Sequence, residues 1–172
     1  MSVKNNSITT TTMTTGTPIF FKLTISKGEK AQRGTFIREG EYGGEAVVAD
    51  ADGNEYTVQT HRINRVPQMG LYANNILHTD AYAYEIVEVR TENKVMIRKL
   101  DATLKPEWKP EIIPGGFSGH CTNNRSQEWD YAPNDENKVI AIRRRKDGRF
   151  YDKHGSRYAI DDSPYRFHDY NF

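Results

Sequence analysis

The stretch that decides the fold is "AYAYEIVEVRTENKVMIRKLDA", residues 81–102. Two runs rich in β-branched and aromatic residues flank the polar turn "TEN", and this is the pattern of a β-hairpin. Successive side chains of a strand point to opposite faces, so one face of the first run is expected to hold Tyr82, Tyr84, Ile86 and Glu88. The centre of the chain is therefore predicted to be β structure.

Similar signals lie on both sides of this hairpin. Upstream, "GEAVVADADGNEYTVQT" (44–60) alternates around an Asp-Gly turn signal, and its spacing is similar to that of SH3-like or KOW-type barrels. Downstream, 138–160 reads as a hairpin around Lys146-Asp147-Gly148, with a second turn at His154-Gly155. No segment keeps a 3.6-residue period over three turns, so at most one or two short helices are expected, near 27–33 or 68–76.

These signals predict a mostly-β protein built from two small SH3-like or twisted-barrel units. Residues 1–17 are rich in Thr, Ser and Asn and are expected to form a disordered tail, although Thr also suits an edge strand. Residues 18–67 are expected to form a small barrel-like unit. Residues 68–172 are expected to form a second β unit with a long irregular loop, 103–137, and an aromatic C-terminal tail that docks on the unit.

Composition limits the setting of the protein. The net charge is +1 and the mean hydropathy is −0.79, and no apolar run approaches the roughly 20 residues of a membrane span. A single cysteine, Cys121, rules out an intramolecular disulfide and a zinc site with several thiolates. The N-terminus lacks the apolar core of a signal peptide. We expect a cytoplasmic location, in a bacterial host cell if the protein is delivered there, and no membrane partner.

The strongest charge cluster runs from Lys138 to Arg157, with eight basic residues against Asp147 and Asp152. Guanidinium groups bind phosphate through planar forks, so the residues expected to meet phosphate are Arg143, Arg144, Arg145 and Arg149. Tyr151 is expected to stack on a base. Two other interpretations stay open: a solvated hairpin whose charges prevent edge aggregation, or ion pairs with the acidic segment 101–137.

The stretch "EIIPGGFSGHCTNNRSQEWDY" (111–131) is the second candidate site. Trp108 and Trp129 flank it and are expected to wall a pocket. Its polar side chains offer paired donors and acceptors for a planar ligand: His120, Asn123, Asn124 and Arg125. The alternative is a self-satisfied Ω-loop plugged by its tryptophans.

Catalytic chemistry has weaker signals. Neighbouring side chains in an extended segment point apart, so His120 is not expected to activate Cys121, which reads as a small semi-buried thiol. The five histidines are scattered without metal-ligand spacing. No catalytic residue, metal or cofactor is predicted, and the protein is expected to be non-catalytic.

From about residue 70 to 172 the chain resembles small uncharacterised proteins encoded by phages and prophage-like elements. The residues that carry the likeness are "DAYAYEIVEV", "KLDATLKPEWKPEIIPGGFSGHCTNN", "EWDY" and "FHDYNF". The resemblance implies a phage context but transfers no activity. Small phage proteins of this kind often bind a component of the host, for example to counteract a defence system.

Together these observations predict a binding protein for a phosphate-bearing ligand, either a nucleotide signal or nucleic acid. One alternative is an inhibitor of a host protein that uses the aromatic tail, or a phage structural or accessory protein. The other is a metal-dependent hydrolase built on His and Asp residues.

Overall fold

The computed structural model describes residues 13–24, 28–115 and 119–171, and half of the chain lies in strands. Contacts divide the chain into two compact units, Met1–Arg65 and Val66–Phe172. Helical structure in the described residues is limited to two 3-10 turns, Thr60–Arg62 (η1) and Asn124–Ser126 (η2). The mostly-β prediction is therefore confirmed. The two ranges suggested for short helices, 27–33 and 68–76, contain strand residues instead. One strand begins at Gln32 and another at Tyr72.

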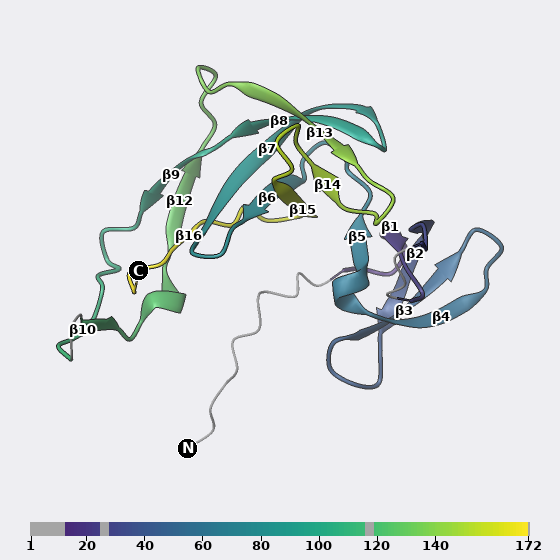
Figure 1. The fold of residues 1–172 in the computed structure, drawn as a ribbon, viewed down its shortest axis with the longest axis horizontal. Coiled ribbons are helices and arrows are strands. Elements are labelled where there is room, and N and C mark those ends of the chain that lie inside the picture. The colour runs from purple at the N-terminus through teal and green to yellow at the C-terminus, as the bar shows by residue number, and fades with distance from the viewer. Residues whose placement is uncertain (1–12, 25–27, 116–118, 172) are drawn as a thin grey trace. The chain divides into compact units, whose positions relative to one another are not determined.

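The first unit is a five-stranded antiparallel sheet with the order β4-β3-β2-β1-β5 (Figure 1). Its strands are β1 (Pro18–Phe21), β2 (Gln32–Glu39), β3 (Glu45–Asp50), β4 (Glu55–Gln59) and β5 (Ile63–Arg65). The predicted hairpin at 44–60 is β3–β4, and Glu45 pairs with Gln59. The fifth strand follows η1 and returns to pair with the first, as expected for an SH3-like unit.

Order in the first unit begins before Pro18. Gly16 N donates to Phe36 O at 2.9 Å, and Thr15 Oγ1 donates to Ile37 O at 2.7 Å. Met13 packs against the buried cluster of this unit, which includes Ile19, Phe21 and Phe36. Residues 13–17 of the predicted tail are thus placed by contacts, and residues 1–12 lie outside the described residues.

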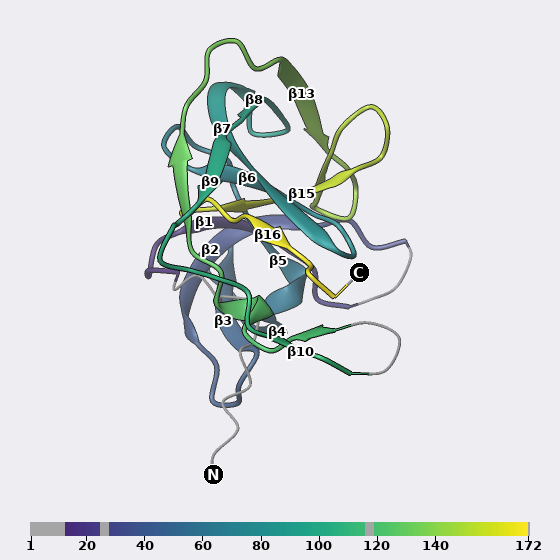
Figure 2. The same cartoon turned by 90° about the vertical axis from the view of Figure 1, so that its left-hand side faces the viewer.

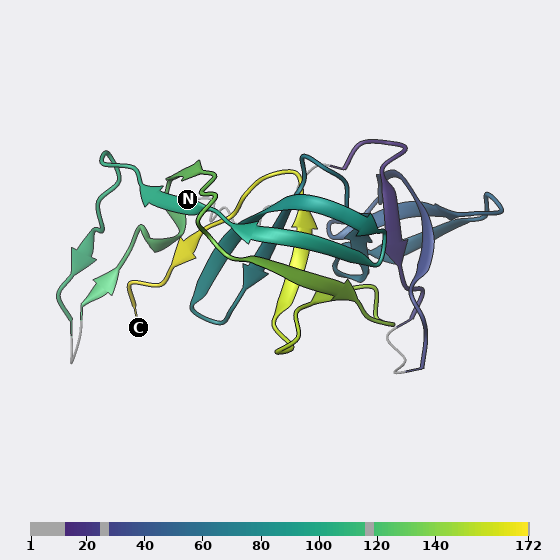
Figure 3. The same ribbon diagram turned by 90° about the horizontal axis from the view of Figure 1, so that it is seen from above.

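The second unit contains a closed six-stranded antiparallel barrel, β7-β6-β15-β14-β13-β8, in which β8 pairs back onto β7 (Figures 1 and 3). Its strands are β6 (Tyr72–Ile76), β7 (Asp80–Thr91), β8 (Lys94–Lys99), β13 (Val139–Arg144), β14 (Phe150–Tyr151) and β15 (Arg157–Asp161). The short strand β16 (Phe167–His168) adds to the start of β7. The aromatic tail is therefore docked through Phe167 and His168, as predicted, and Phe172 lies outside the described residues.

The barrel core explains the alternation in the opening stretch and corrects it in one place. Tyr84 and Ile86 face the core, together with Val95, Ile142 and Phe150. A register shift between Ile86 and Glu88 then inserts one extra residue. A bulge of this kind reverses the facing of the residues that follow, so Val89 packs against the core and Glu88 is exposed.

The predicted loop 103–137 is more regular than expected. We call residues 101–137 the extension (Figure 2). It contains β9 (Asp101–Leu104) paired with β12 (Trp129–Ala132), and β10 (Ile112–Ile113) paired with β11 (His120–Cys121), with η2 between β11 and β12. The C-terminal segment that follows β16 runs beside it (Figure 1). Gly116, part of the predicted Pro-Gly-Gly turn, lies outside the described residues.

Candidate ligand-binding site

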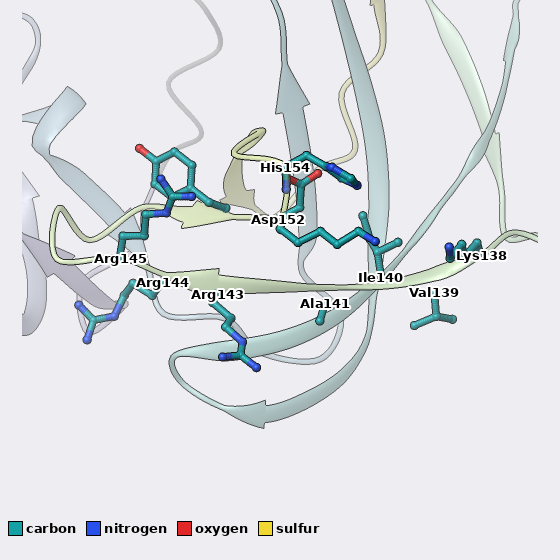
Figure 4. Close-up of a pocket in the computed structure, with 11 residues that line it drawn as sticks. Lys138, Val139, Ile140, Ala141, Arg143, Arg144, Arg145, Asp152 and His154 are labelled. Carbon is teal, nitrogen blue, oxygen red and sulfur yellow. The ribbon is translucent and has the colours of Figure 1, made fainter.

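A pocket of about 750 Å³ lies along β13 in the second unit (Figure 4). Drug-sized and cofactor-sized ligands occupy pockets of roughly 300–1,000 Å³. The lining residues come from β13 with its flanks, from the end of β14 and from the turn after it: Lys138, Val139, Ile140, Ala141, Arg143, Arg144, Arg145, Tyr151, Asp152, Lys153 and His154.

The pocket exists because β13 pairs unequally with its two neighbours. Along β8 the ladder runs from Val139 to Arg143. Along β14 it covers only Arg143 and Arg144, opposite Tyr151 and Phe150. The turn that follows Tyr151 then leads the chain away from β13, so the first half of β13 lines the pocket with its free edge.

The turn beyond β14 is fixed by one carboxylate. Asp152 Oδ1 accepts hydrogen bonds from His154 N at 2.8 Å and Ser156 N at 2.9 Å. Partial burial raises the pKa of Asp152, but the N–H donors of Ser156 and His154 outweigh it and hold the pKa below its ordinary value. Asp152 is the one acidic residue among the described lining residues, and its negative charge is already engaged by these donors.

The pocket is strongly cationic. Within residues 13–24, 28–115 and 119–171, no ion pair joins Lys138, Arg143 or Lys153 to a carboxylate. The acidic extension pairs elsewhere, through Arg98 with Asp135 and Lys105 with Glu128. The prediction that the hairpin charges neutralise segment 101–137 therefore finds no support at these three cations.

The three consecutive arginines have different surroundings. In Figure 4, Arg143 and Arg144 extend to one side of β13, whereas Arg145 turns toward the side of Asp152 and His154. Arg144 Nε donates to Asn93 Oδ1 at 2.7 Å, and partial burial lowers its pKa. Arg143 is exposed. These positions leave Arg143 and Arg145 better placed than Arg144 to meet an incoming anion.

Tyr151 is held in place rather than free to stack on both faces. The Arg145 guanidinium lies over its ring at 4.2 Å from the centroid, and its hydroxyl donates to Asp147 Oδ2 at 2.7 Å. Burial, followed by the bond to Asp147, raises the pKa of Tyr151. Arg149, in the turn before β14, donates its backbone N–H to Asp147 Oδ1 and is not among the lining residues.

The other predicted site residues lie in the extension, away from the described pocket lining: Trp108, His120, Asn123, Asn124, Arg125 and Trp129. Among the described residues, the lining of the pocket along β13 therefore combines the cationic hairpin with none of these six residues. The extension leaves the barrel after β8 and folds on its own strand pairs and on the C-terminal segment, so a site shared by both sets of residues stays a prediction.

The polar side chains of the extension are used internally. Asn123 Oδ1 accepts from Glu111 N, and Asn123 Nδ2 donates to Lys109 O at 2.7 Å. Asn124 is 7% exposed and donates to Asp169 Oδ1 at 2.6 Å. Gln127 bridges to the C-terminal segment by accepting from His168 N at 3.0 Å. The alternative of a self-satisfied loop describes this segment better than a polar ligand clamp.

The tryptophans also face internal partners. Trp108 packs on Tyr170 with ring centroids 5.4 Å apart. Trp129 lies under the Arg166 guanidinium at 5.1 Å. The neighbours His120 and Cys121 point apart as expected, since His120 is exposed and Cys121 is 3% exposed, with Sγ 3.3 Å from Asn123 Oδ1.

Two other features were sought in the part of the chain that the structure describes, a group of metal ligands and a membrane-spanning helix. No group of three or more His, Cys, Asp or Glu side chains gathers there as metal ligands. Neither of its two short helical turns has the length and apolar character of a membrane-spanning helix.

Lys138, Lys153 and His154 line the pocket together with the first half of β13, and the sequence did not predict this arrangement. Lys138 and Lys153 were counted in the charge cluster but not assigned to a site. The available signal was the second turn at His154-Gly155, which separates the chain after Tyr151 from β13 and places Lys153 and His154 across the pocket from it.

The described fold and pocket define an all-β protein of two units, with a cationic pocket at one strand of a closed six-stranded barrel. No family model matches the chain, and no curated protein or solved structure matches it.

Proposed function

We propose that the second unit binds a phosphate-bearing ligand of nucleotide size in the pocket along β13. The observation that carries the proposal is the gathering of cations in one pocket of about 750 Å³ without carboxylate partners at Lys138, Arg143 and Lys153 in the described residues. Arginine and lysine bind phosphate by charge-assisted hydrogen bonds.

The remaining lining suits the non-phosphate part of such a ligand. Val139, Ile140 and Ala141 supply apolar contacts at the other end of β13. Ligand pockets commonly combine apolar walls with a few polar groups that set orientation. The proposal is for binding rather than catalysis because these groups supply charge and shape, while the single thiol lies in the extension.

The resemblance to phage-encoded proteins suggests a biological role for this binding, which is to counteract a defence system of the host. Holding a nucleotide signal of the host would withdraw it from a defence system. The protein-inhibitor alternative has less support, because Tyr170 of the aromatic tail that it requires packs on Trp108 and on His168.

The proposal is tested by calorimetric titration of the full chain with ATP and with inorganic tripolyphosphate. Replacing Arg143 or Lys153 with alanine is expected to weaken binding about tenfold each, because one charge-assisted bond is worth roughly 1.5 kcal/mol or more. Arg125→Ala is the matched control, since Arg125 is exposed in the extension; it should leave affinity unchanged.

Absence of binding to any phosphate probe would overturn the proposal, as would equal losses in Arg143→Ala and Arg125→Ala. A single-stranded oligonucleotide that binds more tightly than either probe, with a steep loss of affinity in salt, would assign the pocket to nucleic acid instead.

A further inference from the structure

The free edge of β13 offers backbone groups to the pocket. Arg144 N donates to Asn93 O across the β8 ladder, and Arg145 N donates to Arg149 O on the β14 side. Peptide groups of an antiparallel strand alternate between its two edges. Even-numbered residues of β13 therefore hydrogen bond to β8, and odd-numbered residues face the β14 side.

Among the described residues, two odd-numbered residues of β13, Val139 and Ala141, have no strand on their β14 side. Arg143 pairs with Tyr151, but the β14 ladder stops there. Within the described residues, Val139 and Ala141 pair only with Arg98 and Met96 of β8, in the positions where the peptide groups point away from β8. Both residues line the pocket, so their N–H and C=O groups are directed toward it.

These groups form a specific pattern. On one edge of a strand, the C=O of residue i and the N–H of residue i+2 lie next to each other. Val139 C=O and Ala141 N–H thus present an acceptor beside a donor. Nucleobases carry the complementary pattern, because each has an N–H donor next to a ring nitrogen or carbonyl acceptor on its pairing edge.

The cations lie at a suitable distance, Arg143 within β13 and Arg145 directly after its end. At about 3.3 Å per residue, Arg143 and Arg145 follow Ala141 by roughly 7 and 13 Å. This separation is comparable with that between the base and the phosphates of an extended nucleoside polyphosphate. Val139 and Ile140 lie at the base end, where apolar contact with a flat ring is favourable.

We infer that the free edge of β13 recognises a nucleobase through Val139 C=O and Ala141 N–H, while Arg143 and Arg145 hold the phosphates from opposite sides of the chain. The inference rests on the proposed function and narrows its ligand from any phosphate-bearing molecule to a nucleoside phosphate. Recognition of this kind discriminates against a polyanion without a base, because the two backbone groups would then stay unpaired.

The test compares nucleotides with tripolyphosphate on the full chain. The tightest of ATP, GTP, CTP and UTP is expected to bind at least about tenfold more tightly than tripolyphosphate, as one or two added hydrogen bonds allow. Ala141→Pro removes the N–H that faces the pocket and leaves the β8 ladder intact, because proline is tolerated where the N–H points away from a neighbour. In this variant the nucleotide should fall to the affinity of tripolyphosphate.

Ala141→Val is the matched control, because it keeps the N–H and should keep the preference for nucleotides. Tripolyphosphate affinity should be the same in all three proteins. If tripolyphosphate binds the unaltered protein as tightly as every nucleotide, the inference is overturned while the proposed function stands. This first comparison needs no variant and is decisive even if Ala141→Pro does not fold.

Two further results would also overturn the inference. If no phosphate probe binds, both the inference and the proposed function fail. If an extended acidic peptide binds in preference to every nucleotide, the free edge of β13 would instead be assigned to strand addition.

Discussion

Asn124 was predicted to contact a ligand, but its side chain instead forms hydrogen bonds that hold the extension to the C-terminal segment. Its side-chain amide donates to Asp169 Oδ1, and its Oδ1 accepts from Gln127 Nε2 and Tyr170 N. A buried amide with all these partners has little capacity left for a ligand. The sequence displayed its polarity but not its burial, because the residues that bury it lie more than forty positions away.

Asn124→Ala is therefore expected to destabilise the second unit by about 1–3 kcal/mol, because buried polar partners are left unsatisfied. Both tryptophans of the chain lie in the extension, so urea unfolding followed by tryptophan fluorescence measures this change directly. Arg125→Ala at the neighbouring exposed position should shift the midpoint little. A stability loss in Arg125→Ala as large as that in Asn124→Ala would contradict the assignment.

At the scale of the element, one turn device recurs in both units. The segments "DADGNEY" (50–56) and "DKHGSRY" (152–158) share the spacing Asp-x-x-Gly-x-x-Tyr. In each, the Asp accepts two backbone N–H bonds and the hydroxyl of the Tyr, at 3.0 Å from Tyr56 and 3.3 Å from Tyr158. Gly53 and Gly155 have φ values of +86° and +92°, which favour glycine.

The turn predicts a pH dependence of stability. Because the folded-state pKa of Asp152 is lowered, its contribution is fully present above the unfolded pKa of about 3.9 and is lost as pH falls through the lower folded value. Urea unfolding should show that stability declines below about pH 4. Asp152→Asn should be less stable at pH 7 and should decline less between pH 5 and pH 3. An identical decline in both proteins would refute the role of this carboxylate.

Elements with short-range causes could be predicted from the sequence, and elements with long-range causes could not. Alternating residues and Asp-Gly turns located the hairpins β3–β4, β7–β8 and β13–β14. The barrel also needs the pairing of β6 with β15, which joins Tyr72 to Asp161. A contact between residues so far apart in the sequence leaves no local pattern. The free edge of β13 depends on where the β14 ladder stops, and that is a property of the barrel.

At the scale of the molecule, each unit has its own buried cluster. Phe36 is 2% exposed in the first, and Ile142 is fully buried in the second. Domains with separate cores can unfold as separate cooperative transitions. We therefore expect a core substitution in one unit to act on the transition of that unit.

Ile142→Ala is expected to lower the stability of the second unit by about 2–5 kcal/mol, through lost burial and a cavity. Phe36→Ala is expected to lower that of the first unit by about 3–5 kcal/mol. Tryptophan fluorescence, which reports only the second unit, should shift in Ile142→Ala and stay near its original midpoint in Phe36→Ala. Equal shifts of the fluorescence midpoint would show that the units unfold together.

The contacts of the extension with the C-terminal segment affect the order in which parts of the chain can fold during translation. Cys121 N donates to Asn171 Oδ1, and Asn124 and Gln127 bond to residues 168–170. Translation reaches those partners more than forty residues after the extension residues that they contact, whereas domains tend to fold from the N-terminal side as they emerge. The described strands of the first unit are complete at Arg65, so this unit can fold early, but the extension has to wait for residues 168–171.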